Sequence, residues 1–228
     1  VVAGRAVDTE AEAHAAIDAM LLDNRMGDAG ARVVVEDFLD GEEASFIVMV
    51  DGQNVLPLAT SQDHKARDDG DRGPNTGGMG AYSPAPVVTP AIHERVMREV
   101  IMPTVRGMAA EGNVYTGFLY AGLMVAPDGT PKVLEYNCRF GDPETQPIMM
   151  RLKSDITALC DAAIDGQLDA ISAEWDSRAA LGVVMAAGHG VGQGGRHLAQ
   201  VGHHVGDGAQ LGPAQAPEQG SALLRSQL

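Results

Sequence analysis

The stretch that decides the fold is KVLEYNCRFGDPETQ, residues 132–146. Lys132–Cys138 is predicted to be a strand, and a helix is expected from about Glu144 to Lys153. Side chains at i and i+2 of a strand share a face, so Glu135 and Asn137 should present two oxygen atoms side by side. Such oxygens suit a hard cation such as Mg²⁺. For this pair alone, the favoured interpretation is two solvent-facing side chains on a half-buried strand, because such short patterns recur by chance.

Charged residues stand where this strand ends and the helix begins. Arg139 is followed by Asp142-Pro143-Glu144, which places a cation and two carboxylates at the junction. Strand ends and helix N-termini are where phosphates and polar substrates bind, and the pattern therefore favours a binding site. The alternative is an ordinary helix start, with Asp142 as the cap and Pro143 at the first helical position; both interpretations can hold at once.

The rest of the chain alternates between short strands and capped helices. The strand at 132–138 should pair with Tyr115–Ala126 across the turn Asp128-Gly129. Further strands are expected at Arg32–Glu36, Ser45–Val50, Val55–Ala59 and about residues 182–187, and Val1–Val2 should be the tail of another. A first helix should open with a Thr9/Glu12 capping box, and a second should start at Thr89-Pro90 and be kinked or broken by Pro103. A further helix is expected over Asp155–Ile164, capped by Ser154.

Residues 61–86 differ from their surroundings. Gly, Pro, Asn and Asp dominate and the hydrophobic period disappears, which predicts a long functional loop. Its segment GPNTGGMG, residues 73–80, holds four glycines, which let a backbone approach a ligand closely and turn N–H groups toward an anion. Asp63, Lys65 and Arg67 stand just before it, which favours a phosphate or substrate site over a flexible surface loop. We expect this loop to lie beside Asp142-Pro143-Glu144, across one cleft.

The connection Glu36–Glu43, EDFLDGEE, is acidic and lies between two apolar strands. A connector of this kind exposes backbone groups that can pair with the edge of a purine, while a nearby carboxylate can hold ribose hydroxyls. From these eight residues alone, the favoured interpretation is an acidic linker between two subdomains.

The composition narrows the partners. The net charge of −15 and the absence of Lys/Arg stripes argue against nucleic acid. No signal peptide or transmembrane run is visible, and two scattered cysteines, Cys138 and Cys160, are typical of reduced thiols. The histidines lack metal-ligand spacing, which makes a zinc site improbable. We therefore expect a cytoplasmic, monomeric protein with small-molecule partners and no membrane association.

Taken together, these stretches resemble the phosphoribosylamine–glycine ligase family, also called glycinamide ribonucleotide synthetase. The likeness runs from about Val1 to Ala187, and its most specific motifs are GPNTGGMGAY and NCRFGDPE, whose order and spacing also match. It implies an α+β ATP-grasp fold, in which two α+β subdomains grip ATP. On this basis we expect part of the small subdomain at residues 1–43, the large subdomain at 44–180, and a remnant or aberrant, poorly ordered region at 181–228.

The resemblance also implies an activity and a set of site residues. The family joins glycine to 5-phosphoribosylamine with ATP and Mg²⁺ or Mn²⁺, through glycyl phosphate; the alternative is an inactive nucleotide-binding fragment of this ligase. The implied residues are Glu36 and the Phe38-Leu39 backbone for adenine, Glu43 for ribose, Glu135 and Asn137 for the metal, Asp63, Asn75, Thr76, Gly77, Gly78, Met79, Pro143 and Glu144 for the substrates, and Arg139, Asp142 and Lys65 for catalysis, with Arg139 offsetting developing charge.

The sequence departs from the family pattern at several points. The N-terminal substrate domain and the Gly-rich phosphate loop are missing or cut through, and Ala66 stands where the family usually has Arg. After Ala187 the family motif is replaced by His189–Gln193 and an unrelated tail, for which a frameshift is our hypothesis. We expect this chain alone to fold in its middle and not to catalyse the ligation.

Overall fold

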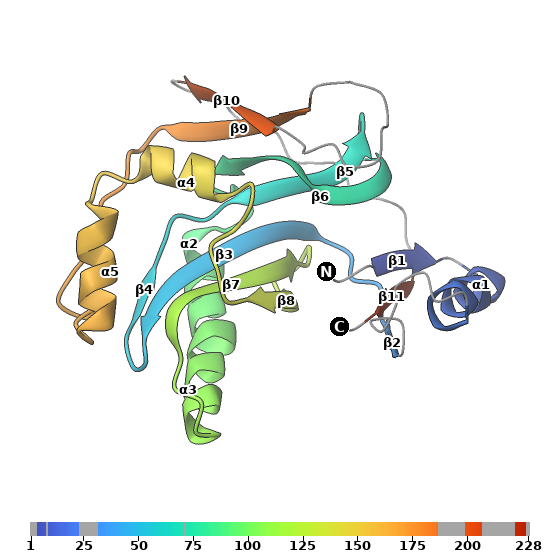
Figure 1. Cartoon of the computed structure of the whole chain (residues 1–228), viewed down its shortest axis with the longest axis horizontal. Helices are drawn as coiled ribbons and strands as arrows, with labels where there is room; N and C mark the ends of the chain where they lie inside the picture. Colours follow the sequence, from blue (N-terminus) through green and yellow to red (C-terminus); the bar gives the residue numbers. More distant parts are fainter. Residues whose placement is uncertain are drawn as a thin grey trace. The chain divides into compact units, whose positions relative to one another are not determined.

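The computed structural model describes residues 4–7, 9–22, 32–70, 72–186, 199–206 and 222–226 (Figure 1). The expected strand tail at Val1–Val2 and the segment His189–Gln193 lie outside these residues. The chain forms two compact units, Val1–Gly41 with Gln215–Leu228, and Glu42–Ala214, each of which is described by itself.

The first unit is a small antiparallel sheet with one helix. Its strands β1 (Gly4–Val7), β11 (Ala222–Ser226) and β2 (Val33–Glu36) lie in the order β1-β11-β2. The helix α1 (Glu10–Leu21) begins with the predicted capping box: the Thr9 hydroxyl accepts from the Glu12 amide, and the Glu12 carboxylate accepts from the Thr9 amide, both at 3.2 Å. The box satisfies two N–H groups that would otherwise lack helical partners.

The central sheet of the second unit has the order β4-β3-β7-β8, with every neighbouring pair antiparallel. The strands are β3 (Glu42–Asp51), β4 (Val55–Pro57), β7 (Thr116–Val125) and β8 (Pro131–Asn137). The hairpin expected across Asp128-Gly129 is thereby confirmed. Residues 44–50 of β3 are all buried, so both faces of this strand are covered.

Helices cover the two faces of β3. Phe46, Val48 and Val50 pack into a core with α2 (Pro90–Val96), the π-helical turn η2 (Met97–Ile101) and α3 (Met102–Ala110) (Figure 1). Ile47 and Met49 point to the opposite face, into a core with α4 (Thr145–Arg151) and α5 (Ile156–Ile164). This alternation positions the functional face, because Glu43 and Ser45 share the face of Ile47 and Met49.

Helix starts and breaks only partly follow the predictions. Thr89 caps α2 as expected, accepting from the Ile92 amide at 3.3 Å. Pro103 does not break the helix; the π-helical turn precedes it, and the Thr104 hydroxyl donates to the Val100 carbonyl at 2.8 Å. A proline has no N–H to donate within the helix, so this side chain supplies a donor where the backbone ladder is disturbed.

Two predicted helix caps are wrong. The cap of α5 is Asp155, which accepts from the Thr157 amide at 2.8 Å, whereas the neighbouring Ser154 accepts from the Glu174 amide. At the start of α4, Asp142 is not the cap, since Glu144 occupies that position and makes no capping hydrogen bond. The Glu144 carboxylate is turned instead toward β3, where it has another partner.

The predicted loop at 61–86 is also wrong. It is a hairpin of β5 (Gln62–Asp68) and β6 (Arg72–Ser83), part of a second sheet with the order β10-β9-β6-β5. The other strands are β9 (Ala179–Ala186), which confirms the strand expected near 182–187, and β10 (Ala199–Gly206). The hydrogen bonds between these strands are made by backbone groups, so glycines and polar residues can form them without an alternation of apolar side chains.

Arg151 fastens the end of α4 to this second sheet. Its side chain is only 8% exposed. Its guanidinium donates to the carbonyls of Asp176 and Arg178 and, at 2.9 Å, to the hydroxyl of Ser83 at the end of β6. Burial lowers the pKa of Arg151, against the attraction of Asp176. The clamp holds α4, and with it Glu144 at the other end of the helix, against the sheets.

Candidate active site

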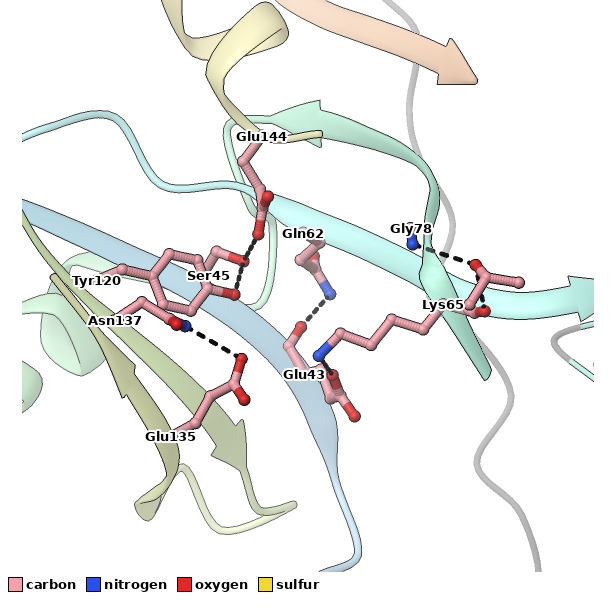
Figure 2. A network of polar contacts seen from close by, with 10 residues as sticks. Glu43, Ser45, Gln62, Lys65, Gly78, Tyr120, Glu135, Asn137 and Glu144 are labelled. Carbon is pink, nitrogen blue, oxygen red and sulfur yellow. Dashed lines mark hydrogen bonds and ion pairs between the residues drawn. The ribbon is translucent and has the colours of Figure 1, made fainter. Parts of the chain in front are cut away.

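The floor of the site is one end of the central sheet. In the antiparallel register, Ser45 of β3 faces Gly122 of β7, Gly122 faces Glu135 of β8, and Tyr120 faces Asn137. Cross-strand partners share a face, so these residues gather on the side that carries the α4–α5 core (Figure 2). Gly122 lets two of these side chains approach the sheet closely, since a Cβ added to it would lie 3.1 Å from Glu135 Cγ and 3.3 Å from Tyr120 Cε1.

Glu135 and Asn137 lie side by side on β8, as their spacing predicts. The Asn137 amide donates to Glu135 Oε1 at 3.3 Å, and both side chains are half-buried. Together they offer carboxylate and amide oxygens, the ligand types that Mg²⁺ or Mn²⁺ accepts. Among the described residues no group of three or more His, Cys, Asp and Glu side chains could hold a metal by itself. The pair therefore fits a cation that completes its shell with ligand oxygens and water.

Lys65 is the cation of the site. Its ammonium lies 3.1 Å from Glu43 Oε2, which joins β5 to β3. Burial opposes the charge, but the carboxylates of Glu43, Asp63 and Glu135 outweigh it and raise the pKa of Lys65. Gln62 strengthens the same junction by donating to the Glu43 carbonyl at 2.9 Å. Lys65 thus remains an ammonium beside three carboxylates.

Glu144 enters the site from the start of α4 and is only 2% exposed (Figure 2). The Ser45 hydroxyl donates to Glu144 Oε1 at 2.7 Å, and the Tyr120 hydroxyl lies 3.0 Å from the same Ser45 oxygen. Because Ser45 gives its proton to Glu144, Tyr120 must be the donor to Ser45. Burial, reinforced by the negative charge of Glu144, raises the pKa of Tyr120, which keeps this phenol protonated.

Asp63 lies on β5, two positions before Lys65. Burial raises the pKa of Asp63 to about 6; the charge of Lys65 lowers it, whereas Glu144 and Glu43 raise it further. The site therefore brings together more carboxylates than cations among the described residues.

The glycine-rich segment forms a bulge in β6. The register passes from His64 opposite Gly80 to Ala66 opposite Asn75, so Thr76–Met79 stand opposite Lys65 alone. The Thr76 hydroxyl folds the bulge over by donating to the Lys65 carbonyl at 2.9 Å and accepting from the Gly78 amide at 3.1 Å.

The bulge touches the start of α4. Gly78 has a φ of +125°, and a Cβ added to it would lie 2.4 Å from Pro143 Cδ. The expected proximity of Gly77-Gly78 to Asp142-Pro143-Glu144 is thereby confirmed. Two segments that are 65 positions apart in the chain close against each other because one of them has no side chain.

Among the described residues of the second unit, the side chains of Arg139 and Asp142 make no hydrogen bond or ion pair with this cluster. Arg139 and Asp142 are exposed, and Arg139 donates to the carbonyl of its neighbour Phe140 at 2.8 Å. Glu36, which ends β2, belongs to the first unit, as do Phe38 and Leu39. Of the remaining bulge residues, Asn75 and Gly77 are exposed and Met79 is half-buried.

Sequence reasoning missed Ser45, Tyr120 and Gln62. Ser45 and Tyr120 were counted only as parts of apolar strands, although a hydroxyl in such a strand must find a partner when it is buried. That rule could have marked both residues, but not their common partner Glu144.

Among the described residues, no helix is long and apolar enough to cross a membrane.

Comparison with known proteins places this site in a family. Residues 2–145 match the family described as phosphoribosylglycinamide synthetase, ATP-grasp (A) domain. The chain is 74% identical over 177 residues to the phosphoribosylamine–glycine ligase of Vibrio vulnificus, covering 78% of this chain and 41% of that protein. It is 72% identical over 181 residues to the ligase of the same name from Allochromatium vinosum, covering 79% of this chain and 42% of that protein.

A solved structure agrees. The crystal structure of phosphoribosylamine–glycine ligase from Thermotoga maritima matches with a TM-score of 0.59 and 39% identity, over 66% of this chain and 37% of that chain. The chain thus spans about 41% of the length of the curated relatives that it matches. The predicted α+β ATP-grasp fold is confirmed, and the chain belongs to the phosphoribosylglycinamide synthetase family, whose ATP-grasp domain its residues 2–145 represent.

Proposed function

We propose that the protein takes part in the ATP-dependent ligation of glycine to 5-phosphoribosylamine, which gives glycinamide ribonucleotide, ADP and phosphate. The observation that carries this proposal is the family match over residues 2–145, because every residue that we assign to the site lies inside it. We further propose that the enzyme acts as a monomer in the cytoplasm.

The ligation divides into two balanced steps. A glycine carboxylate oxygen attacks the γ-phosphorus of ATP, the bond to the bridging oxygen breaks, and ADP leaves with that electron pair, giving glycyl phosphate. The amine nitrogen of phosphoribosylamine then attacks the acyl carbon, the bond to the phosphate oxygen breaks, and the nitrogen loses a proton. Neither step needs a protein nucleophile, so the residues serve mainly to position the reactants and to balance charge.

The site residues divide this work between them. Glu135 and Asn137 would hold Mg²⁺ or Mn²⁺, which when bound neutralises charge on the nucleotide phosphates. Lys65, kept charged by its carboxylate neighbours, and the exposed Arg139 would offset negative charge on the transferring phosphoryl group. Asp142 stands at the same junction, and we assign it a catalytic role on the strength of the family likeness.

The remaining residues would bind the reactants. We assign adenine to Glu36 and the Phe38-Leu39 backbone, and ribose to Glu43, whose carboxylate Lys65 holds in place. The bulge from Asn75 to Met79, together with Pro143, would form one wall of the substrate site. Its contact with the start of α4 supports this assignment.

A product assay tests the proposal. The protein expressed from its complete gene is incubated with ATP, glycine and phosphoribosylamine, and ADP and glycinamide ribonucleotide are measured. We expect both products in equal amounts, and none when either glycine or phosphoribosylamine is omitted. ATP binding without turnover would instead support a non-catalytic nucleotide-binding protein. Turnover with a different amine alone would identify another carboxylate–amine ligase.

A further inference from the structure

We propose that Ser45, Tyr120 and Gly141 are positioning residues, which bind no reactant themselves and hold the Glu144 carboxylate in one orientation. The inference rests on the proposed function and on the assignment of Glu144 to substrate binding that the family likeness implies. The three residues then act on the reaction only through Glu144.

Glu144 needs support from outside its own helix. It stands at the start of α4 without making a capping hydrogen bond, so the helix does not hold its side chain. It is 2% exposed, so bulk water does not hold its carboxylate either. Groups that bind a reactant must be kept within about 0.5 Å of the productive geometry by the residues packed around them. For Glu144, this support must come from other elements of the fold.

Ser45 holds one oxygen of the carboxylate. Its hydroxyl donates to Glu144 Oε1 at 2.7 Å, and the residue is 1% exposed (Figure 2). The backbone of Ser45 is fixed on both sides, because Gly122 of β7 pairs with it and Ser61 exchanges two backbone hydrogen bonds with it, at 2.8 and 3.2 Å. The freedom that remains is the rotation of the hydroxyl group.

Tyr120 removes this rotation. Its hydroxyl lies 3.0 Å from the Ser45 oxygen and is the donor of that hydrogen bond, since Ser45 gives its own proton to Glu144. The ring is 4% exposed and packs in the apolar core with α4 and α5. A buried ring keeps its polar tip at a fixed point. The Ser45 hydroxyl, which accepts from one side, is thereby directed at Glu144 on the other.

Gly141 makes room for the second oxygen. A Cβ added to Gly141 would lie 2.6 Å from Glu144 Oε2 and 2.7 Å from Glu144 Cδ. The carboxylate thus lies directly against the backbone of residue 141, whose carbonyl accepts from both the amide and the hydroxyl of Thr145. The φ of Gly141 is outside the left-handed region, so alanine there causes no backbone strain. The added methyl would displace the end of a flexible side chain, which is the carboxylate itself.

The experiment measures kcat and the KM for glycine, phosphoribosylamine and ATP, with the protein expressed from its complete gene. Glu144→Gln is measured first, because it identifies the substrate whose KM depends on Glu144. The positioning variants, each made alone and together with Glu144→Gln, are Ser45→Ala, Tyr120→Phe and Gly141→Ala. Thermal unfolding is recorded for every variant.

Two matched controls come from outside the site. Tyr115→Phe also removes a hydroxyl with one partner, the carbonyl of Phe118, from a ring that packs against the α2–α3 core. Gly107→Ala adds a methyl that meets no heavy atom within 4 Å. Neither control should change any KM.

We expect each positioning variant to raise the same KM as Glu144→Gln and to leave the KM for ATP unchanged. The rise should be about 3–10-fold for Tyr120→Phe, which removes a hydrogen bond between two neutral groups, and at least about tenfold for Ser45→Ala, which removes one to a charged group. Gly141→Ala should also cost at least about tenfold, because it misplaces the carboxylate. Together with Glu144→Gln, none of the three should have a further effect. A merely structural role would lower the unfolding temperature without selecting one substrate.

Three results would overturn the inference. They are an unchanged KM in folded positioning variants, no effect of Glu144→Gln on any KM, and effects that multiply with that of Glu144→Gln. If Glu144→Gln does not fold, Tyr120→Phe and Gly141→Ala must still raise one and the same KM, and a rise in different ones would contradict the common action through Glu144. Absence of glycinamide ribonucleotide from the unmodified protein would refute the proposed function itself, which is a separate outcome.

Discussion

Replacing Gly78 by alanine should destabilise the protein far more than the same change at Gly77. At Gly78 the new Cβ would lie 2.4 Å from Pro143 Cδ and 3.1 Å from Pro143 Cγ, and the φ of +125° disfavours any L side chain. Overpacking of this kind costs about 1–3 kcal/mol, and a strained backbone conformation costs another 1–3 kcal/mol or so. We therefore expect Gly78→Ala to lower the free energy of unfolding by about 2–6 kcal/mol.

Gly77 provides the matched control, because a Cβ added there has no neighbouring heavy atom within 4 Å. Urea unfolding of both variants, followed by circular dichroism, measures the difference. Gly77→Ala should stay within about 0.5 kcal/mol of the unmodified protein. If the two variants have equal stability, the bulge does not contact Pro143, and our account of this wall is wrong.

Three further predictions concern charged residues. Glu135→Gln should reduce metal affinity at least about 10–100-fold while costing under about 1 kcal/mol of stability, because the one hydrogen bond that Glu135 makes among the described residues, from Asn137, is long. Metal titration and unfolding measure the two effects. Asp63→Asn should stabilise the ligand-free protein at pH 7 by up to about 3 kcal/mol. The folded-state pKa of Asp63, about 6, exceeds its ordinary value of 3.8, so between these pH values the folded protein binds more protons than the unfolded chain. The free energy of unfolding therefore falls as the pH rises from 3.8 to 6. Urea unfolding at pH 4 and pH 7 should show this fall in the unmodified protein and not in Asp63→Asn. Arg151→Met should cost about 2–4 kcal/mol in thermal or urea unfolding, because the carbonyls of Asp176 and Arg178 lose their buried donor, whereas an unchanged stability would contradict the clamp.

Local sequence signals predicted the parts of the fold that depend on near neighbours. The Thr9 and Thr89 caps and the β7–β8 hairpin follow from residues a few positions apart, and all three are confirmed. The region 61–86 was misjudged because its strands lack an apolar alternation. One strand carries the polar site residues and the other carries glycines in contact with other backbone, as at Gly80, where a Cβ would lie 2.6 Å from the Gly182 carbonyl oxygen.

The same distinction holds for the site. Glu135 and Asn137 could be paired from the sequence, since strand geometry alone puts positions i and i+2 on one face. The Ser45, Tyr120 and Glu144 contacts could not, because they join residues 75 and 99 positions apart. The pairing of β3 with β7 brings Ser45 to Tyr120, and the position of α4 brings Glu144 to Ser45. The reactive groups were recognisable by type, but their partners depend on the tertiary fold.

The close approach at Gly122 has a practical consequence for the interpretation of sequence variants. Alanine in place of glycine within a strand is usually scored as mild, and strand propensity would even favour it. Here the added methyl would press on Glu135 and Tyr120, at 3.1 and 3.3 Å, and would displace two side chains of the site. A screen that ranks positions by the chemistry of their side chains would pass over Gly122, although the placement of Glu135 and Tyr120 depends on its having none.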